Sequence, residues 1–454
     1  MDKLLTSLID LVEAADFHAL EPADVDAVVR HTIDTIGCGA GGFASAPATR
    51  SREVTRGTGG ALTASVYGEP AKVLVDQAAF ANTTADRYLD FNDFGISGHP
   101  SDMIPALFAM AEAAGGSGAD LVTSIHLAYE IATHLAEAVP ADGGWDQGLY
   151  CSLGIAAGQA KLLRLPPEQI GHALSLAVVP SIPLRVTRFG ELSEWKAAAT
   201  AHAAMTATFA VRLAAAGMTG PPDPFEGKDG LLERVWPTFE PASARVSTSA
   251  IRRASLKRHP ACYWAQVPID LALALREQVR LTDVVSIEVE TCVNAWRSIG
   301  GGRGDAAEKW RPPTRETADH SMPFLMGVAL IDGQISDVAF TDERLTDRTL
   351  LSIVDRISVI ERADLSVRAG RDGCPTAVTV TLADGTIASA EADVPRGHPD
   401  NPMSDAEVMT KFETLASRAL SPTHARALSS LLSGLPELST VDEIAAIFRD
   451  FAAP

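Results

Sequence analysis

The chain has 454 residues, of which 46% are hydrophobic, 21% are charged and only 6% are aromatic. This length allows a large buried core and predicts two or three domains. The formal net charge of −20 disfavours nucleic acid and anionic membranes as partners. The same negative field repels a polycarboxylate, so a site for such a ligand needs local cations.

The N-terminal residues lack the basic and apolar pattern of a signal peptide, and no run of about eighteen uncharged apolar residues occurs. We therefore expect a cytoplasmic protein without a membrane span. The five cysteines are scattered and form no Cys-x-x-Cys pair. Neither a disulfide framework nor a zinc site is expected, and a reducing compartment fits.

The first part of the chain, to about residue 270, predicts mainly helices. Apolar side chains recur at helical spacing over residues 120–139, 168–179 and 197–216. Pro166 and Pro167 stand just ahead of the second segment, where first-turn prolines are common. Gly217 is a typical stop signal after the third segment, whose many alanines favour close packing of helices.

The pattern changes near residue 283. Val285, Ile287 and Val289 alternate with polar residues, which predicts a strand with one solvent-facing side. Residues 377–382 and 386–390 alternate across Asp384-Gly385, which predicts a β-hairpin. Helical spacing returns over residues 406–451.

These patterns predict a mainly α protein with two domains. A large all-α domain is expected from residues 1–270 together with 401–454, so that both chain ends contribute to it. A smaller α+β domain is expected to be inserted at residues 271–400.

A first candidate segment, residues 87–102, reads RYLDFNDFGISGHPSD. It predicts a helix end, a glycine-containing loop and a new helix that Ser101 or Asp102 caps. His99 lies just ahead of this helix start, whose partial positive charge disfavours an imidazolium and leaves a neutral ring able to accept a proton. The backbone N–H groups there suit a carboxylate ligand. The alternative is a polar turn in which His99 is only a cap.

A second segment, residues 185–196, reads RVTRFGELSEWK and leads into an apolar helix. Lys196 begins this helix, and a buried lysine there requires a carboxylate or a ligand as its partner. The alternative is a solvated lysine in the first turn. His202 lies about 120° away around an ideal helix, so we predict that it is a hydrogen-bonded core histidine outside this site.

A third segment, residues 257–266, reads KRHPACYWAQ. Lys257 and Arg258 concentrate positive charge there, as an anionic substrate requires. Cys262 is interpreted as an acid, a hydrogen-bond partner or a small buried group, and free cysteines are usually the last of these.

A fourth segment, residues 315–324, reads RETADHSMPF. A polar run ahead of an apolar helix favours helix capping, while the alternative is that Arg315, His320 and Ser321 close over a substrate. The sequence contains no Gly-x-Gly-x-x-Gly after a strand, no P-loop and no His-Glu-x-x-His. No cofactor and no metal is therefore expected.

Two further blocks accompany these segments, MTGPPDPFEGKDG at 218–230 and RGHPDNPMSDAEVMTKF at 396–412. In this order, the blocks resemble those of the MmgE/PrpD family over residues 15 to about 420. The resemblance implies a large helical domain interrupted by an α+β lid domain, a homodimer and a metal-free enzyme. It also implies chemistry through a carbanion or enediolate beside a carboxylate, since the family includes 2-methylcitrate dehydratase, cis-aconitate decarboxylase and an iminodisuccinate epimerase.

The resemblance implies that Asp90, His99 and Lys196 are catalytic and face one polycarboxylate substrate. Weaker candidates for substrate binding or charge compensation are Arg87, Lys257, Arg258, Cys262, His320 and Ser321. The DFND form at residues 90–93 and the GELSEWK block resemble the dehydratase branch of the family more than the decarboxylase branch. This implies a lyase that removes water from a hydroxy di- or tricarboxylate, as a 2-methylcitrate dehydratase does.

Alternatives are an isomerase or epimerase that uses the same carbanion, a decarboxylase, and a ligand-binding homologue without catalysis. Phe94, Trp264 and Phe324 stand where many family members have Thr, His and Tyr, and the loop at 94–98 is shorter than in typical 2-methylcitrate dehydratases. These departures predict a more apolar pocket and a different substrate.

Overall fold

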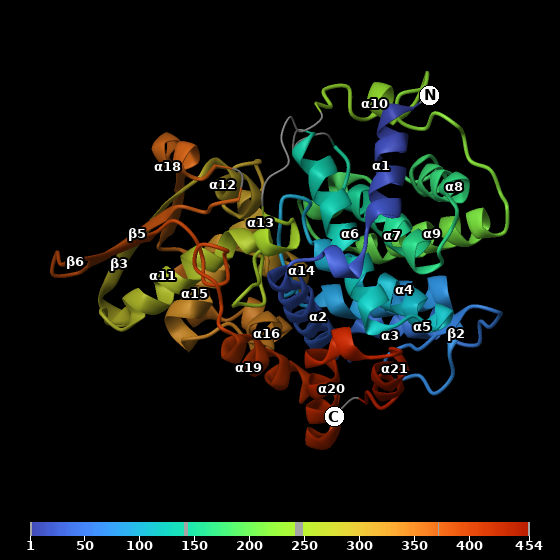
Figure 1. Cartoon of the computed structure of the whole chain (residues 1–454). Coiled ribbons are helices and arrows are strands. Elements are labelled where there is room, and N and C mark those ends of the chain that lie inside the picture. The colour runs from blue at the N-terminus through green and yellow to red at the C-terminus, as the bar shows by residue number, and fades with distance from the viewer. Residues whose placement is uncertain (1, 140–143, 241–247, 371, 453–454) are drawn as a thin grey trace. The chain divides into compact units, whose positions relative to one another are not determined.

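Helices form most of the chain, as the alanine-rich composition predicts. The computed structural model describes residues 2–139, 144–240, 248–370 and 372–452. The chain divides into two units, each drawn in Figure 1. Unit 1 contains Met1–Arg185, Ala197–Ala254 and Ser404–Pro454, and unit 2 contains Val186–Lys196 and Ser255–Met403. Among the described helices, none combines the length and apolarity that a membrane crossing requires.

Unit 1 is built around helices from both ends of the chain. Its α-helices are α1 (Lys3–Ala14), α2 (Pro22–Gly42), α3 (Ala46–Thr55), α4 (Val75–Tyr88), α5 (Ile104–Ala114), α6 (Gly118–Glu137), α7 (Gly148–Leu162), α8 (Pro167–Val178), α9 (Trp195–Ala215), α10 (Leu231–Arg234), α19 (Asp405–Ala416), α20 (Pro422–Ser433) and α21 (Asp442–Phe448). The first turn of α9 begins in unit 2. Short 3₁₀ helices of this unit are η1 (Phe17–Ala19), η2 (Pro100–Met103), η4 (Ile251–Arg253) and η8 (Leu435–Glu437). A further one, η3 (Arg185–Arg188), lies in unit 2 except for its first residue. The predicted helices at 120–139, 168–179 and 197–216 are confirmed as α6, α8 and α9.

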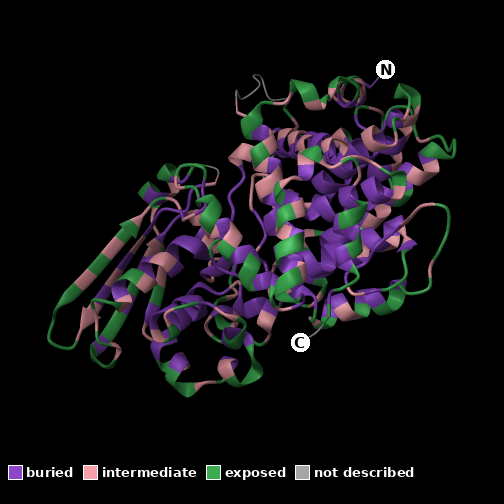
Figure 2. Cartoon of the chain, turned by 60° about the horizontal axis from the view of Figure 1, so that its bottom comes forward, coloured by how far each residue is buried: buried purple, intermediate pink, exposed green. Residues whose placement is uncertain are grey.

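Small residues let the central helices of unit 1 approach closely. A Cβ added to Gly154 of α7 would lie 2.8 Å from the carbonyl oxygen of Ala128 on α6, and one on Gly158 would lie 2.9 Å from that of Ser124. Protein interiors are close-packed with few voids, so larger side chains at these two glycines would push the helices apart. Figure 2 shows the resulting band of buried residues through the helices of this unit. Both α6 and α7 also pack against η2, which follows the loop after α4.

Unit 1 also contains a short antiparallel ribbon, so the prediction of an all-α domain is wrong in this detail. Strand β1 (Thr63–Ala64) pairs with β2 (Val73–Leu74). Strands of two residues are too short to produce a recognisable alternation of apolar and polar side chains.

Unit 2 combines a sheet with short helices. The helices are η5 (Tyr263–Ala265), α11 (Gln266–Arg276), η6 (Leu281–Asp283), α12 (Val293–Ile299), α13 (Ala306–Trp310), α14 (Arg315–Ala318), α15 (Met322–Asp332), η7 (Asp337–Phe340), α16 (Asp342–Leu345), α17 (Arg348–Val354) and α18 (Ala363–Arg368). The strands are β3 (Val284–Thr291), β4 (Ile357–Glu361), β5 (Thr376–Leu382) and β6 (Ile387–Ala392). Their order is β4-β3-β5-β6, with β3 parallel to β4 and the other pairs antiparallel.

One face of this sheet packs against α11 and α15. Ile287 and Val289 of β3 are fully buried there, as predicted. Val285 is instead 57% exposed, because the pairing of β3 with β5 is irregular between Val284 and Ser286 and turns Val284 inward. The hairpin of β5 and β6 across Asp384-Gly385 is confirmed.

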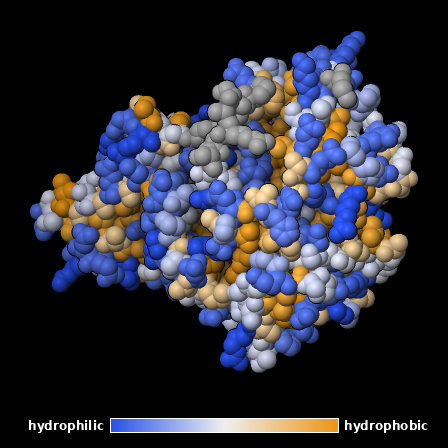
Figure 3. Space-filling view, in the orientation of Figure 1, coloured by the Kyte–Doolittle hydropathy of each residue, from blue (hydrophilic) through white to orange (hydrophobic). Residues whose placement is uncertain are grey.

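Hydrophilic side chains cover much of the surface in Figure 3, with apolar residues scattered among them.

Candidate functional site

Asp90 lies in unit 1, just beyond the end of α4. Its backbone takes the left-handed conformation, with φ of 49°, which Asp adopts more readily than most residues. The Arg87 side chain donates a hydrogen bond from Nη1 to Asp90 Oδ1 at 2.7 Å, and its Nε lies 3.6 Å from Asp102 Oδ2. All three residues are buried. Arg87 therefore offsets the charge of two carboxylates, which suits its predicted role in charge compensation.

His99 lies immediately before η2, which leads directly into α5, so its predicted place ahead of a helix start is confirmed. Its Nδ1 is 2.6 Å from the carbonyl oxygen of Asp93. A carbonyl only accepts hydrogen bonds, so Nδ1 carries a hydrogen and, in the neutral ring, Nε2 keeps a lone pair. Nε2 lies 3.7 Å from Asp90 Oδ1. This nitrogen is thus the atom of His99 that can accept a proton.

Ser101 and Asp102 do not cap α5, so that prediction is wrong. The N-cap residue is Met103, whose side chain makes no capping hydrogen bond, and the backbone N–H of Ile104 donates to the carbonyl oxygen of Ser101. The Ser101 hydroxyl donates to Asp93 Oδ1 at 2.5 Å, and Asp102 Oδ1 accepts from Asn92 at 2.7 Å. Partners in the preceding loop take up both side chains, and sequence spacing alone does not reveal those partners.

Lys196, in unit 2, is buried with only 1% of its surface exposed. Its ammonium nitrogen lies 2.5 and 2.6 Å from the two carboxylate oxygens of Asp319 and 3.5 Å from His320 Nδ1. The alternative of a solvated lysine is therefore wrong, and the requirement for a carboxylate partner is confirmed. Asp319 itself was not among the predicted site residues, although it lies within the fourth segment.

Asp319 is the centre of a polar cluster in unit 2. The carboxylate is fully buried and lies 2.6 Å from His320 Nδ1 and 3.3 Å from Arg315 Nη1, in addition to its contacts with Lys196. Its carbonyl oxygen accepts a hydrogen bond from the backbone N–H of Cys262 at 2.9 Å. Lys196 and Arg315 thus share one carboxylate. The pair of cations exceeds its charge, and a polycarboxylate ligand requires such positive charge.

The remaining residues of the third segment differ in their surroundings. Lys257 is completely buried, whereas the Arg258 side chain is 52% exposed and lies 3.2 Å from Asp270. Cys262 is a buried free thiol, as are the other four cysteines. Because Arg258 is solvated and already paired, its charge contributes little to a buried site.

Ser321 has the capping role that the sequence favours. Its hydroxyl accepts from the backbone N–H of Phe324 at 3.1 Å, at the start of α15, and donates to the carbonyl of Lys309. His202 contradicts its prediction, because it lies exposed on α9 and not in the core. Phe209, seven residues further along the same helix, is 50% exposed and shows that this face of α9 is turned to solvent.

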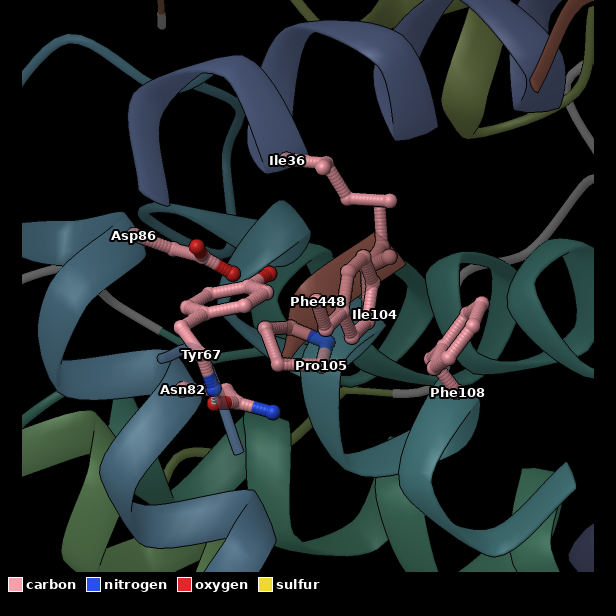
Figure 4. A pocket seen from close by; sticks show the side chains of 8 residues that line it. All are labelled: Ile36, Tyr67, Asn82, Asp86, Ile104, Pro105, Phe108 and Phe448. Atoms are coloured by element: carbon pink, nitrogen blue, oxygen red, sulfur yellow. Dashed lines mark hydrogen bonds between the residues drawn. The ribbon is translucent and has the colours of Figure 1, made fainter. Parts of the chain in front are cut away.

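A small hollow within unit 1, lined in part by Asp86 and Ile104, is too narrow to hold a water molecule. Figure 4 shows Asp86 beside the Tyr67 ring in this hollow. Burial, the largest effect, raises the pKa of Asp86 well above its ordinary value of 3.8. This hollow is accordingly a packing feature around a buried acid and not a substrate site.

Comparisons with known proteins match nearly the whole chain. Residues 6–243 match the model of the MmgE/PrpD N-terminal domain, and residues 259–435 match that of the MmgE/PrpD C-terminal domain. The mitochondrial 2-methylcitrate dehydratase of Yarrowia lipolytica is 25% identical over 412 residues, or 81% of this chain and 75% of the relative. The 2-methylcitrate dehydratase of Salmonella typhi is 25% identical over 442 residues (87% and 86%), and the cis-aconitate decarboxylase of Homo sapiens is 22% identical over 444 residues (94% and 90%).

Proposed function

The chain belongs to the MmgE/PrpD family, and from this premise we propose that it is a hydro-lyase acting on a hydroxy di- or tricarboxylate of the 2-methylcitrate type. The observation that carries the proposal is the state of His99, whose hydrogen is held on Nδ1 while Nε2 is left to exchange a proton. The relatives named 2-methylcitrate dehydratase support this choice of reaction.

The reaction is a β-elimination of water. A base removes the proton from the carbon next to a carboxylate, and the electron pair passes through an enediolate into the new carbon–carbon double bond. The hydroxyl group leaves with a proton supplied by an acid. We assign His99 Nε2 as the base or the acid and Asp90 as the group that orients it or exchanges protons with it.

The cations of unit 2 supply the electrostatic part of the proposal. Lys196 contacts a substrate carboxylate or the leaving hydroxyl, and Arg315 adds positive charge beside it. Stabilisation of the enediolate by fixed cations is worth most in a buried setting, where water does not screen them. Lys196 and Arg315 are mostly buried, at 1% and 14% side-chain exposure. Lys257 and His320 are the further substrate-binding candidates on the same unit.

A second candidate function is an isomerase or epimerase that forms the same carbanion and returns the proton to the opposite face. The observation that favours a changed substrate or outcome is Phe94, whose ring packs edge-on against His99 with centroids 5.7 Å apart. An apolar wall beside the imidazole alters which substrate group fits there. The cis-aconitate decarboxylase among the relatives leaves decarboxylation as a third outcome of the test.

The proposed function is tested by incubating the protein with a panel of hydroxy di- and tricarboxylates in deuterated water and following them by NMR. Net loss of water is the expected result. Deuterium incorporation without net turnover would replace the dehydratase with an epimerase, and release of carbon dioxide would replace it with a decarboxylase. Binding without any chemical change would reduce the protein to a ligand-binding homologue.

Three properties complete the proposal. The enzyme works without a metal or another cofactor, because its proton transfers and charge stabilisation are assigned to side chains. It is cytoplasmic, which its five free and buried cysteines fit. It forms a homodimer, which light scattering on the purified chain measures directly.

A further inference from the structure

We propose that Asp93 is a positioning residue that fixes the tautomer and orientation of the His99 imidazole. The inference rests on the function proposed above, in which His99 transfers a proton. It adds a residue to the site that has no contact with the reacting atoms in that mechanism.

The backbone of Asp93 provides the first half of this role. Its carbonyl oxygen lies 2.6 Å from His99 Nδ1 and accepts the Nδ1 hydrogen. A hydrogen bond at one ring nitrogen determines which nitrogen of a neutral histidine is protonated. As long as this carbonyl stays in place, Nε2 is the nitrogen available for proton transfer.

The side chain of Asp93 provides the second half by holding that backbone in place. The carboxylate is completely buried and accepts four hydrogen bonds. Oδ1 accepts from the backbone N–H and the hydroxyl of Ser101, at 3.0 and 2.5 Å. Oδ2 accepts from the Tyr129 hydroxyl at 2.8 Å and lies 3.1 Å from His31 Nδ1.

These bonds connect the loop to two helices of unit 1. His31 belongs to α2 and Tyr129 to α6, and their rings pack edge-on at 5.7 Å. Burial, followed by the negative charge of Asp93, raises the pKa of Tyr129 well above 10.0, so this phenol stays protonated and donates. Asp93 therefore has hydrogen-bond partners on α2, on α6 and at Ser101, which lies two residues beyond His99.

The loop between Asp93 and His99 is closed on itself as well. Gly95 and Gly98 exchange two backbone hydrogen bonds of 2.8 and 2.9 Å. Gly98 has a φ of +94°, and a Cβ at this position would lie 2.0 Å from Gln147 Oε1. With both ends tied and its centre paired, the loop gives the imidazole little freedom to rotate or to exchange tautomers. Precise placement of this kind is what proton transfer requires.

The first test reads the tautomer directly and needs no substrate. The full chain is labelled with ¹⁵N-histidine, and the His99 signals are identified by their loss in His99→Gln. In the wild type we expect a protonated Nδ1 and an unprotonated Nε2 at a pH where the ring is neutral. In Asp93→Asn we expect a mixture of tautomers. The amide NH₂ would face two of the four groups that donate to the carboxylate, so the Asp93 backbone would no longer be held in place.

The second test is kinetic and uses the same variants on the substrate found in the panel. Asp93→Asn should lower kcat on the order of 10²-fold with little change in KM, because substrate contacts remain while the proton carrier is misplaced. Tyr129→Phe removes one hydrogen bond, keeps the charge of Asp93 and should lower kcat less. It also decides the matter if Asp93→Asn fails to fold. Tyr67→Phe, another buried tyrosine of unit 1 without a bond to Asp93, is the matched control and should leave kcat unchanged.

The inference is overturned if wild-type His99 carries its hydrogen on Nε2. It is also overturned if Asp93→Asn, or Tyr129→Phe in its place, leaves both the tautomer and kcat at wild-type values. A tautomer that depends on Asp93 in a protein that transforms no polycarboxylate would retain the positioning role and refute the proposed function instead.

Discussion

Replacement of Lys196 by methionine should destabilise unit 2 by about 3 kcal/mol, because it leaves the buried carboxylate of Asp319 without the ammonium group at 2.5 Å. Removal of one partner of a buried ion pair typically costs about 3–5 kcal/mol. Arg315 at 3.3 Å and His320 at 2.6 Å remain beside Asp319, which places the expected cost at the lower end. The measurement is urea unfolding of wild type, Lys196→Met, Asp319→Asn and the double variant.

The double variant separates pairing from simple loss of packing. It removes both charges together, so it should be more stable than the sum of the two single changes predicts, by an interaction energy of about 1–3 kcal/mol. Lys196→Met with wild-type stability, or strictly additive changes, would refute the buried pair. All three variants should lack turnover, since Lys196 is assigned to the substrate and Asp319 orients it.

Activity should be unchanged after treatment with EDTA, and inactivation that a divalent ion reverses would contradict the metal-free assignment. Light scattering should give the mass of a homodimer, and a monomer at working concentration would contradict it. Asp86→Asn should stabilise the protein at neutral pH and flatten the decline of stability with rising pH. The sign follows because the raised pKa makes the folded state hold a proton that the unfolded state has lost above its pKa of about 3.8, so wild-type stability falls as pH rises through that window. Urea midpoints that depend equally on pH in both proteins would show that Asp86 does not titrate in this way.

Local sequence patterns predict the elements whose own residues carry the signal. The helices α6, α8 and α9 and the hairpin across Asp384-Gly385 follow from apolar spacing and turn chemistry. Val285 was placed on the wrong face, because the irregular pairing of β3 and β5 depends on the partner strand and leaves no sign in β3 alone.

The candidate site shows more clearly that contacts with distant residues leave no pattern in the local sequence. The position of Lys196 at the start of an apolar helix predicted that a buried ammonium needs a carboxylate, but spacing does not say which one, and Asp319 lies more than a hundred residues away. Ser101 and Asp102 have the residue types of helix caps, yet Asp93 and Asn92 bind them instead. Such choices are decided by tertiary contacts, which compete with local hydrogen bonding.

His99 is the proton carrier on which the proposed function depends, and one variant tests this role. His99→Gln, assayed for turnover and for thermal stability in the same preparation, should lose about 10²–10⁴-fold in rate, as expected for a general acid or base. Its stability should change by at most about 1–2 kcal/mol, since the net value of a hydrogen bond such as the one from His99 to the Asp93 carbonyl is of this order. Substrate affinity should persist, because Lys196 is unchanged. A lowered melting temperature with nearly wild-type turnover would contradict the account and show that His99 is a structural residue.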